Sequence, residues 1–206
     1  MSKHDTTSGS PVEKSELLKS ENILDGFFHV QRLALRHTLC KTGAWSPTLE
    51  RYILHRPDAV CAVVYHRERA SLYFVRQFRV GTFQKDHGWL TELAAGLIDE
   101  GETPEQAIER EVREELGFQI ANPVLIQKMY TTPGIINERV FLFYTEVVEE
   151  DRLHAGGGNA HEHEDLEIVE VPVQHLDEFM QKQDILDAKT IVGIQWFLAR
   201  QQAVNQ

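Results

Sequence analysis

The sequence has only two cysteines, Cys40 and Cys61, among its 206 residues. Two cysteines give no indication of the disulfide framework of a small secreted domain, and a reducing compartment is expected instead. Long apolar runs are missing as well: the first twenty residues have no continuous apolar core, and nowhere do about eighteen apolar residues follow one another. We therefore expect a cytoplasmic protein with no signal peptide and no membrane partner.

Basic side chains are in the minority, since 21 Lys and Arg residues stand against 32 Asp and Glu residues. The formal net charge is −11 at pH 7, and a protein of this charge repels the phosphates of a nucleic acid. A nucleic-acid partner is therefore not expected. A small polyanionic substrate would have to be bound with the help of cations.

The length of the chain suits one well-buried core with a small additional layer. Residues 1–20 are polar and without periodicity, which is typical of a disordered tail. Residues 21–56 mix apolar and polar side chains in strand fashion around the turn "KTGAWSP" and predict an accessory antiparallel β region. Residues 57–206 are expected to form the main domain.

Within the main domain, strand-like and helix-like segments are interspersed without strict alternation. This arrangement favours an α+β fold or a mixed-sheet sandwich over a doubly wound parallel sheet. Helical spacing of apolar residues is found in residues 173–183 and 190–202. The strand-like segments are residues 59–66, 70–79, 121–132, 138–148 and 166–173.

The stretch "GLIDEGETPEQAIEREVREELGF", residues 96–118, is unusually acidic. Thr103 is a good N-cap, Pro104 suits the first helical position, and Gln106 completes a capping-box pattern. A helix is therefore predicted from Thr103 to near Gly117. The carboxylates of this stretch are those of Asp99, Glu100, Glu102, Glu105, Glu109, Glu111, Glu114 and Glu115.

The helix carries an apolar stripe and a stripe of carboxylates beside it. Glu111, Glu114 and Glu115 belong to the second stripe, and such neighbours repel by roughly 0.2–0.5 kcal/mol per exposed pair. Hard divalent cations, which prefer oxygen ligands, would relieve this repulsion. The alternative is a solvated charged face with ion pairs such as Arg110 with Glu114. The apolar stripe consists of Ile108, Val112 and Leu116.

The acidic pattern extends beyond the helix. Gly96, five residues, Glu102, seven residues and then "REVREELGF" match the signature of the Nudix hydrolases, GX5EX7REUXEEXGU, in which U is a bulky apolar residue. The aromatic Phe118 at the last U position is a mild departure. The sequence thus resembles this family, which implies an α/β/α sandwich around a mixed β-sheet. It also implies hydrolysis of a nucleoside diphosphate linked to another moiety.

The resemblance assigns roles to residues of this box. Glu111 and Glu115 are implied as principal ligands of Mg²⁺ or Mn²⁺, together with the backbone carbonyl of Ala95. Glu114 is implied as a further ligand, directly or through water. Arg110 is implied to orient the carboxylates, and Glu102 to support the loop before the helix.

The similarity extends from about Phe28 to Trp196, where the chain resembles the ADP-ribose pyrophosphatase and nucleotide-sugar hydrolase branch of the family. The segments "KTGAWSPTLERYILHR", "RQFRV" and "TTPGIINE" carry this further resemblance. In this branch the N-terminal sheet, here residues 21–56, is exchanged between two subunits. A homodimer is therefore expected.

Substrate-binding residues follow from the same resemblance. Phe28 and Arg51 are candidates for contacts with the base, and Arg79 for a contact with a phosphate, to which a guanidinium supplies paired donors. Gly134 and Glu138 belong to the Pro-Gly segment of the branch. Surface arginines and a packed phenylalanine are the alternative interpretation.

The loop "HAGGGNAHEHED", residues 154–165, combines three glycines with acidic residues. The glycines predict backbone freedom, as a closing catalytic loop needs. The resemblance implies Glu162 as the general base, with Glu114 as the less favoured choice, and Glu164 as a further metal ligand. A solvated acidic loop is one alternative. A zinc site on the histidines is another, but no partner cysteine or regular spacing supports it.

Four functions are compatible with these patterns. The first is hydrolysis of ADP-ribose to AMP and ribose 5-phosphate. The second is hydrolysis of GDP-mannose or UDP-glucose. The third is a non-catalytic nucleotide-sugar sensor, against which the complete set of box carboxylates argues. The fourth is a triphosphate hydrolase, which would not need the extension from Phe28 to Arg56.

Overall fold

The computed structural model describes residues 13–159, 165–181 and 187–204. The chain divides into two compact units. The first ends at Arg56 and also includes Thr132–Asn137, and the second comprises Pro57–Thr131 and the chain from Glu138 onward. The division places the segment 132–137, expected to be a turn of the main domain, with the N-terminal unit instead.

The first unit contains a three-stranded antiparallel sheet in the order β1-β2-β3. In contrast to the tail predicted over residues 1–20, residues 15–20 form part of β1, because their backbone pairs with β2 as far as Ser15 opposite His37. The segment 132–137 is held to the end of β3, where the N–H of Leu54 donates to the carbonyl of Ile135 at 2.8 Å. The strands are β1 (Ser15–Asp25), β2 (His29–His37) and β3 (Leu49–His55).

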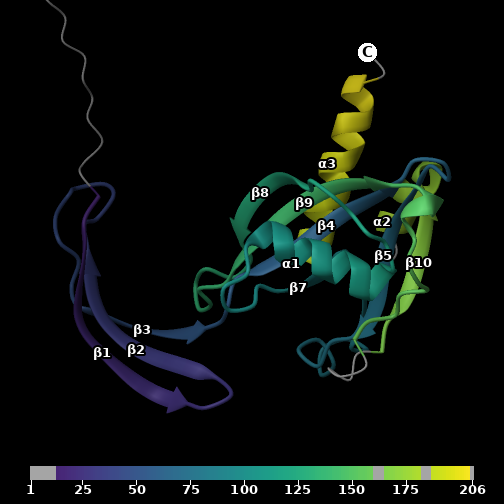
Figure 1. Ribbon diagram of the computed structural model, residues 1–206. Helices are drawn as coiled ribbons and strands as arrows, with labels where there is room; N and C mark the ends of the chain where they lie inside the picture. The colour runs from purple at the N-terminus through teal and green to yellow at the C-terminus, as the bar shows by residue number, and fades with distance from the viewer. Residues whose placement is uncertain (1–12, 160–164, 182–186, 205–206) are drawn as a thin grey trace, which may run out of the picture. The chain divides into compact units, whose positions relative to one another are not determined.

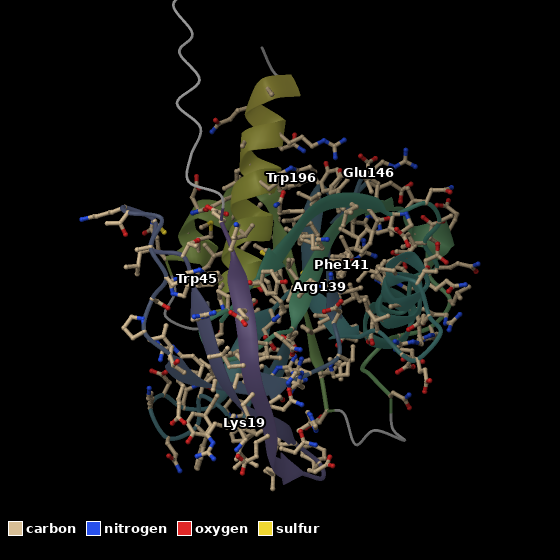
Figure 2. The ribbon with its side chains drawn as sticks, turned by 90° about the vertical axis from the view of Figure 1, so that its left-hand side faces the viewer. Lys19, Trp45, Arg139, Phe141, Glu146 and Trp196 are labelled. Carbon is tan, nitrogen blue, oxygen red and sulfur yellow. The ribbon has the colours of Figure 1, made fainter. Side chains whose placement is uncertain are left out.

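Charged side chains connect the polar residues of β1 to β2. Arg36 lies 2.6 Å from Glu16, and Arg32 lies 2.7 Å from Glu21. Trp45, labelled in Figure 2, packs under the guanidinium of Arg36 at 4.7 Å. Large apolar side chains of this unit remain exposed, including Leu17, Leu18, Ile23, Leu24, Phe27, Phe28 and Tyr52.

The second unit is built on a seven-stranded mixed sheet whose path is β10-β5-β4-β9-β8. β6 pairs with β5, and β7 pairs with β4. β4 and β9 run parallel, and the other pairs are antiparallel. The strands are β4 (Ala59–His66), β5 (Ser71–Phe78), β6 (Trp89–Glu92), β7 (Ala94–Leu97), β8 (Val124–Tyr130), β9 (Arg139–Val147) and β10 (Glu167–Pro172).

Helices cover both faces of this sheet, with α1 on one face and α3 on the other (Figure 1). In the described part of the chain no helix is both long and apolar enough to cross a bilayer. The helical elements are α1 (Pro104–Glu111), the π-helix η1 (Val112–Leu116), the 3₁₀ turns η2 (Glu149–Asp151) and η4 (Val173–His175), α2 (Leu176–Met180) and α3 (Ala188–Val204).

The alternation of side chains along β4 explains the two helical layers. Val60, Ala62 and Val64 point to the core that α1 completes, whereas Cys61 and Val63 point to the core that α2 and α3 complete. Successive side chains of a strand point to opposite faces, so an entirely apolar strand requires a cover on each face. The predicted sandwich around a mixed sheet is confirmed.

The aromatic residues of α3 anchor this helix to the sheet. The ring of Trp196, labelled in Figure 2, lies 5.2 Å from that of Tyr144 on β9. Phe197 is fully buried and lies 5.2 Å from the ring of Tyr65 on β4. The helix predicted from residues 190–202 is therefore a core element.

Candidate functional site

The acidic helix begins and ends as the sequence predicts. The hydroxyl of Thr103 accepts from the N–H of Gln106 at 3.3 Å, and the Gln106 side chain accepts from the N–H of Thr103 at 2.9 Å. This reciprocal capping box fixes the first turn. The helix continues through η1 to Gly117, whose left-handed backbone ends it at φ 80°.

Arg110 connects the loop before the helix to the carboxylates on it. Its guanidinium donates to both oxygens of Glu102 at 3.1 and 3.0 Å, to Glu111 at 2.6 Å and to the carbonyl of Leu97 at 2.9 Å. The hydrogen bond from Arg110 lowers the pKa of Glu102 below its ordinary value. The alternative partner Glu114 lies at 3.6 Å, farther than Glu111. Arg110 thus holds the loop against the helix.

Gly96 makes room for the first of two buried carboxylates on the acidic helix. A Cβ atom at this position would lie 1.8 Å from Oε1 of Glu111. Glu111 is only 7 % exposed, so its carboxylate is packed against the backbone of β7.

Glu115 is the second buried carboxylate, and it is fully buried. Its Oε2 accepts a hydrogen bond from the N–H of Ala95 on β7 at 3.0 Å. The side chains of Glu111 and Glu115 therefore meet the same short strand at adjacent residues, 96 and 95. Glu114 is more accessible, with its side chain 27 % exposed.

A family model of the NUDIX domain matches residues 55–192, which includes the whole box. The chain belongs to the Nudix family. The predicted membership is confirmed, and the match begins at His55, the last residue of β3, and ends within α3.

Curated relatives extend the similarity over most of the chain. The GDP-mannose pyrophosphatase of Enterobacter sp. (strain 638) is 30 % identical over 185 residues, which is 89 % of this chain and 94 % of the relative. The ADP-ribose pyrophosphatase of Haemophilus influenzae is 32 % identical over 187 residues, covering 88 % of this chain and 84 % of the relative. Both names come from the branch that the sequence resembles.

A solved structure, titled as that of an ADP compounds hydrolase, has the same fold. It covers 94 % of this chain and 96 % of its own, with a TM-score of 0.68 and 22 % sequence identity.

Nudix hydrolases generally use divalent metal ions, and the donors gathered at β7 suit a hard cation. They are carboxylate oxygens beside a strand backbone, the ligand type that Mg²⁺ and Mn²⁺ prefer. Gly96 keeps the space around Glu111 free of a side chain. Within the described residues no group of three or more His, Cys, Asp or Glu side chains is arranged to hold a metal. The further expected ligand, Glu164, lies outside the described residues.

The glycine run after the box is fixed to the C-terminal end of the Nudix helix. The N–H of Gly157 donates to the carbonyl of Glu115 at 2.9 Å, and that of Gly158 donates to the carbonyl of Glu114 at 3.1 Å. Gly156 has a φ of +73°, and a Cβ there would lie 2.5 Å from the carbonyl oxygen of Glu115.

Glycines 156–158 have φ values of 73°, 111° and 89°, a left-handed backbone that favours glycine. The expectation that they let a catalytic loop close stays a prediction. In this structure the glycines allow a left-handed backbone and, at Gly156, a close approach to the helix. The predicted base Glu162 lies outside the described residues, as does Glu164.

Arg79, the predicted phosphate contact, is bonded to Glu92 through one nitrogen of its guanidinium. Its Nε donates to Oε2 of Glu92 at 2.6 Å, and its backbone N–H donates to the carbonyl of Gly88 at 2.6 Å. The side chain is 41 % exposed. Glu92 also binds Lys189 of α3 at 2.7 Å. Sequence reasoning missed this pair, because 97 residues separate its members and neither belongs to a motif.

The remaining predicted substrate contacts belong to two different units. Phe28, Arg51 and Gly134 are in the first unit, whereas Glu138 is in the second together with Arg79. Phe28 is 43 % exposed, and Arg51 is exposed with its guanidinium bonded to the carbonyl of Glu50 at 2.7 Å. Their roles remain predictions.

Proposed function

We propose that this Nudix protein hydrolyses the diphosphate bond of a nucleoside diphosphate sugar, with ADP-ribose as the first candidate. The products would be AMP and ribose 5-phosphate. The observation that carries the proposal is that Glu111 and Glu115 of the helix both meet β7, at Gly96 and Ala95, within a complete Nudix box. The names of the relatives, ADP-ribose pyrophosphatase and GDP-mannose pyrophosphatase, support the substrate class.

The proposed cofactor is Mg²⁺ or Mn²⁺. Its ligands would be Glu111, Glu115, the carbonyl of Ala95 and Glu164. When bound, such a cation neutralises diphosphate charge and lowers the pKa of coordinated water. Carboxylates that repel each other on one helix then become favourable neighbours.

Residues of the chain itself supply the remaining steps. Glu162, or less favourably Glu114, takes the proton of the attacking water as general base. Arg110 keeps Glu111 oriented through its bond of 2.6 Å. Arg79 binds a phosphate oxygen with the guanidinium edge that Glu92 does not occupy.

The N-terminal sheet is proposed to complete the binding site in a homodimer. Its exposed apolar side chains, among them Phe27 at 95 % and Leu17 at 59 %, support this, because exposed apolar patches mark protein interaction sites. Phe28 and Arg51 would contact the base, and Gly134 and Glu138 would line the site. We keep the cytoplasm as the expected compartment and expect no nucleic-acid or membrane partner.

A second candidate is hydrolysis of GDP-mannose, and a third is hydrolysis of UDP-glucose. The 30 % identity to a GDP-mannose pyrophosphatase over 94 % of that relative favours the second. A non-catalytic sensor would not require both Glu111 and Glu115, whose presence therefore favours a hydrolase.

A substrate panel tests these proposals. The protein is incubated with Mg²⁺ or Mn²⁺ and, separately, ADP-ribose, GDP-mannose, UDP-glucose, dinucleoside polyphosphates and dGTP. A phosphatase then reveals newly exposed phosphomonoesters. Release from ADP-ribose above the others supports the first candidate, and preference for GDP-mannose replaces it with the second. Absence of release from every compound overturns the hydrolase and leaves the sensor.

A further inference from the structure

A buried carboxylate, Glu92, lies between two cations in the second unit. Glu92 is 3 % exposed. Its Oε2 accepts from Nε of Arg79 at 2.6 Å, and its Oε1 accepts from Nζ of Lys189 at 2.7 Å. Each oxygen therefore has one cationic donor. Arg79 directly follows β5, and Lys189 belongs to α3.

Lys189 is itself fixed by the first turn of α3. Its Nζ lies 3.0 Å from Oδ1 of Asp187, and its side chain is 13 % exposed. Thr190, fully buried, donates to Asp187 at 2.6 Å and accepts from the N–H of Leu93 at 2.9 Å. The ammonium group thus sits at a point where α3 is bound to the strand that leads to Ala95.

The charges in this cluster balance. Burial by itself would lower the pKa of Lys189, but the carboxylates of Glu92 and Asp187 outweigh it, and the pKa lies above its ordinary value. Lys189 is therefore protonated at neutral pH, and with Arg79 it compensates the two carboxylates. If a buried carboxylate loses one of two cationic partners, its charge is left partly uncompensated, and a new hydrogen bond from another donor becomes favourable.

The guanidinium of Arg79, already bound to Glu92, is one such donor. Within the described part of the chain, Arg79 is bonded to Glu92 through Nε alone, which leaves the terminal nitrogens of the guanidinium for other acceptors. An arginine beside a carboxylate with two open oxygens prefers the bidentate arrangement, in which a terminal nitrogen is also used. In the structure Oε1 instead accepts from Lys189.

We propose that Lys189 is a positioning residue, which occupies one oxygen of Glu92 so that Arg79 keeps its terminal nitrogens for the diphosphate of the substrate. This inference rests on the proposed function. It goes beyond that function because it assigns a role in phosphate binding to a residue of α3 that acts only through Glu92 and Arg79.

A competing explanation is that Lys189 merely anchors α3. An anchor would lower stability when removed and would leave substrate affinity unchanged. Arg200 provides a matched control, because it is a cation on the same helix that packs over the ring of Tyr144 at 4.2 Å.

The experiment compares Lys189→Met, Lys189→Arg, Arg79→Lys, the double variant Lys189→Met with Arg79→Lys, and Arg200→Met. Thermal midpoint, KM and kcat are measured with the best substrate of the panel. We expect Lys189→Met and Arg79→Lys each to raise KM by roughly tenfold or more, the size of a lost hydrogen bond to a charged group. Because both act on one contact, the double variant should be no worse than the poorer single variant.

Lys189→Arg should keep KM near that of the wild type, and Arg200→Met should lower the thermal midpoint without changing KM. Additive effects in the double variant overturn the proposal. So does a Lys189→Met variant that changes the thermal midpoint alone.

A measurement on the wild-type protein does not depend on whether the variants fold or whether any nucleotide sugar is cleaved. Inorganic pyrophosphate is added to the metal-free protein, and the arginine side-chain signals are followed by ¹⁵N NMR. The terminal nitrogens of Arg79 should shift, while its Nε–H stays protected from exchange by Glu92. Lack of any Arg79 response overturns the proposal, whereas a response without catalysis overturns only the proposed function.

Discussion

The carboxylate of Glu111 fills the space that a side chain at Gly96 would need. A Cβ atom on residue 96 would lie 1.8 Å from Oε1 and 2.1 Å from the carboxyl carbon of Glu111. The first glycine of the Nudix box is therefore required by a contact with a glutamate fifteen positions later in the same box, and not by the turn conformation of the loop.

Gly96→Ala should move Glu111 out of place. We expect turnover to fall by roughly 100-fold, the upper end of what loss of support for a metal ligand produces. Mn²⁺ affinity, followed by electron paramagnetic resonance, should fall with it. Gly26→Ala is the matched control, since a Cβ at residue 26 meets nothing within 4 Å. Equal Mn²⁺ affinity in the two variants would contradict the role of this contact.

Glu115→Gln should remove most activity and leave the fold intact. The amide can still accept the hydrogen bond from the N–H of Ala95 that now measures 3.0 Å, but it lacks the charge that a dication needs. Turnover should drop by more than the roughly 10–100-fold that loss of a mere supporting group causes. Glu105→Gln, at an exposed position of the same helix, should retain activity. Circular dichroism verifies the fold, and full activity of Glu115→Gln would refute the metal assignment.

The ion pair between Glu102 and Arg110 predicts a pH dependence of stability. The hydrogen bond from Arg110 lowers the pKa of Glu102 in the folded state below 4.5, so the folded protein binds fewer protons than the unfolded chain in that range. The stabilisation is complete above pH 4.5 and is lost as pH falls through the lowered pKa. Urea unfolding should show a stability gap between wild type and Glu102→Gln that stays constant at pH values well above 4.5 and narrows in acid.

A gap that widens in acid would show that the pKa of Glu102 is raised instead. Glu105→Gln again serves as the reference, because Glu105 is exposed and belongs to the same helix. Its stability difference from the wild type should not follow the same acid limb.

Alanine substitutions at Gly156 and Gly157 distinguish backbone strain from a steric clash of the added methyl group. Gly157→Ala, with φ +111° and no atom within 4 Å of the new Cβ, should suffer backbone strain alone, roughly 1–2 kcal/mol of unfolding free energy. Gly156→Ala meets the carbonyl oxygen of Glu115 at 2.5 Å as well, and it should lose more, about 3 kcal/mol.

Amide hydrogen exchange reports directly on the clash between residue 156 and the carbonyl of Glu115. Gly156→Ala should speed exchange at the N–H groups of Gly157 and Gly158, which now donate to the end of the Nudix helix. If both variants lose the same stability and keep the same exchange rates, the close approach of Gly156 to the helix has no energetic importance.

Local sequence signals were sufficient for elements whose cause is local. The capping box of Thr103 and Gln106 and the left-handed end at Gly117 follow from neighbours three or fewer residues apart. The strands β6 and β7 were not separated from the sequence, because four-residue strands leave too short a pattern. The start of β1 at Ser15 was missed because polar side chains there are ordered by partners on β2, such as Arg36 for Glu16.

The sequence by itself determined the Nudix box, the bounds of its helix, the α+β sandwich and the family, because each depends on spacing along the chain. Only the tertiary structure decided which contacts the residues at these spacings make. It packs Glu111 against Gly96, bonds Glu115 to Ala95, and joins Arg79 to Lys189 through Glu92. Contacts between residues far apart depend on how strands and helices are layered, and no local pattern records that layering.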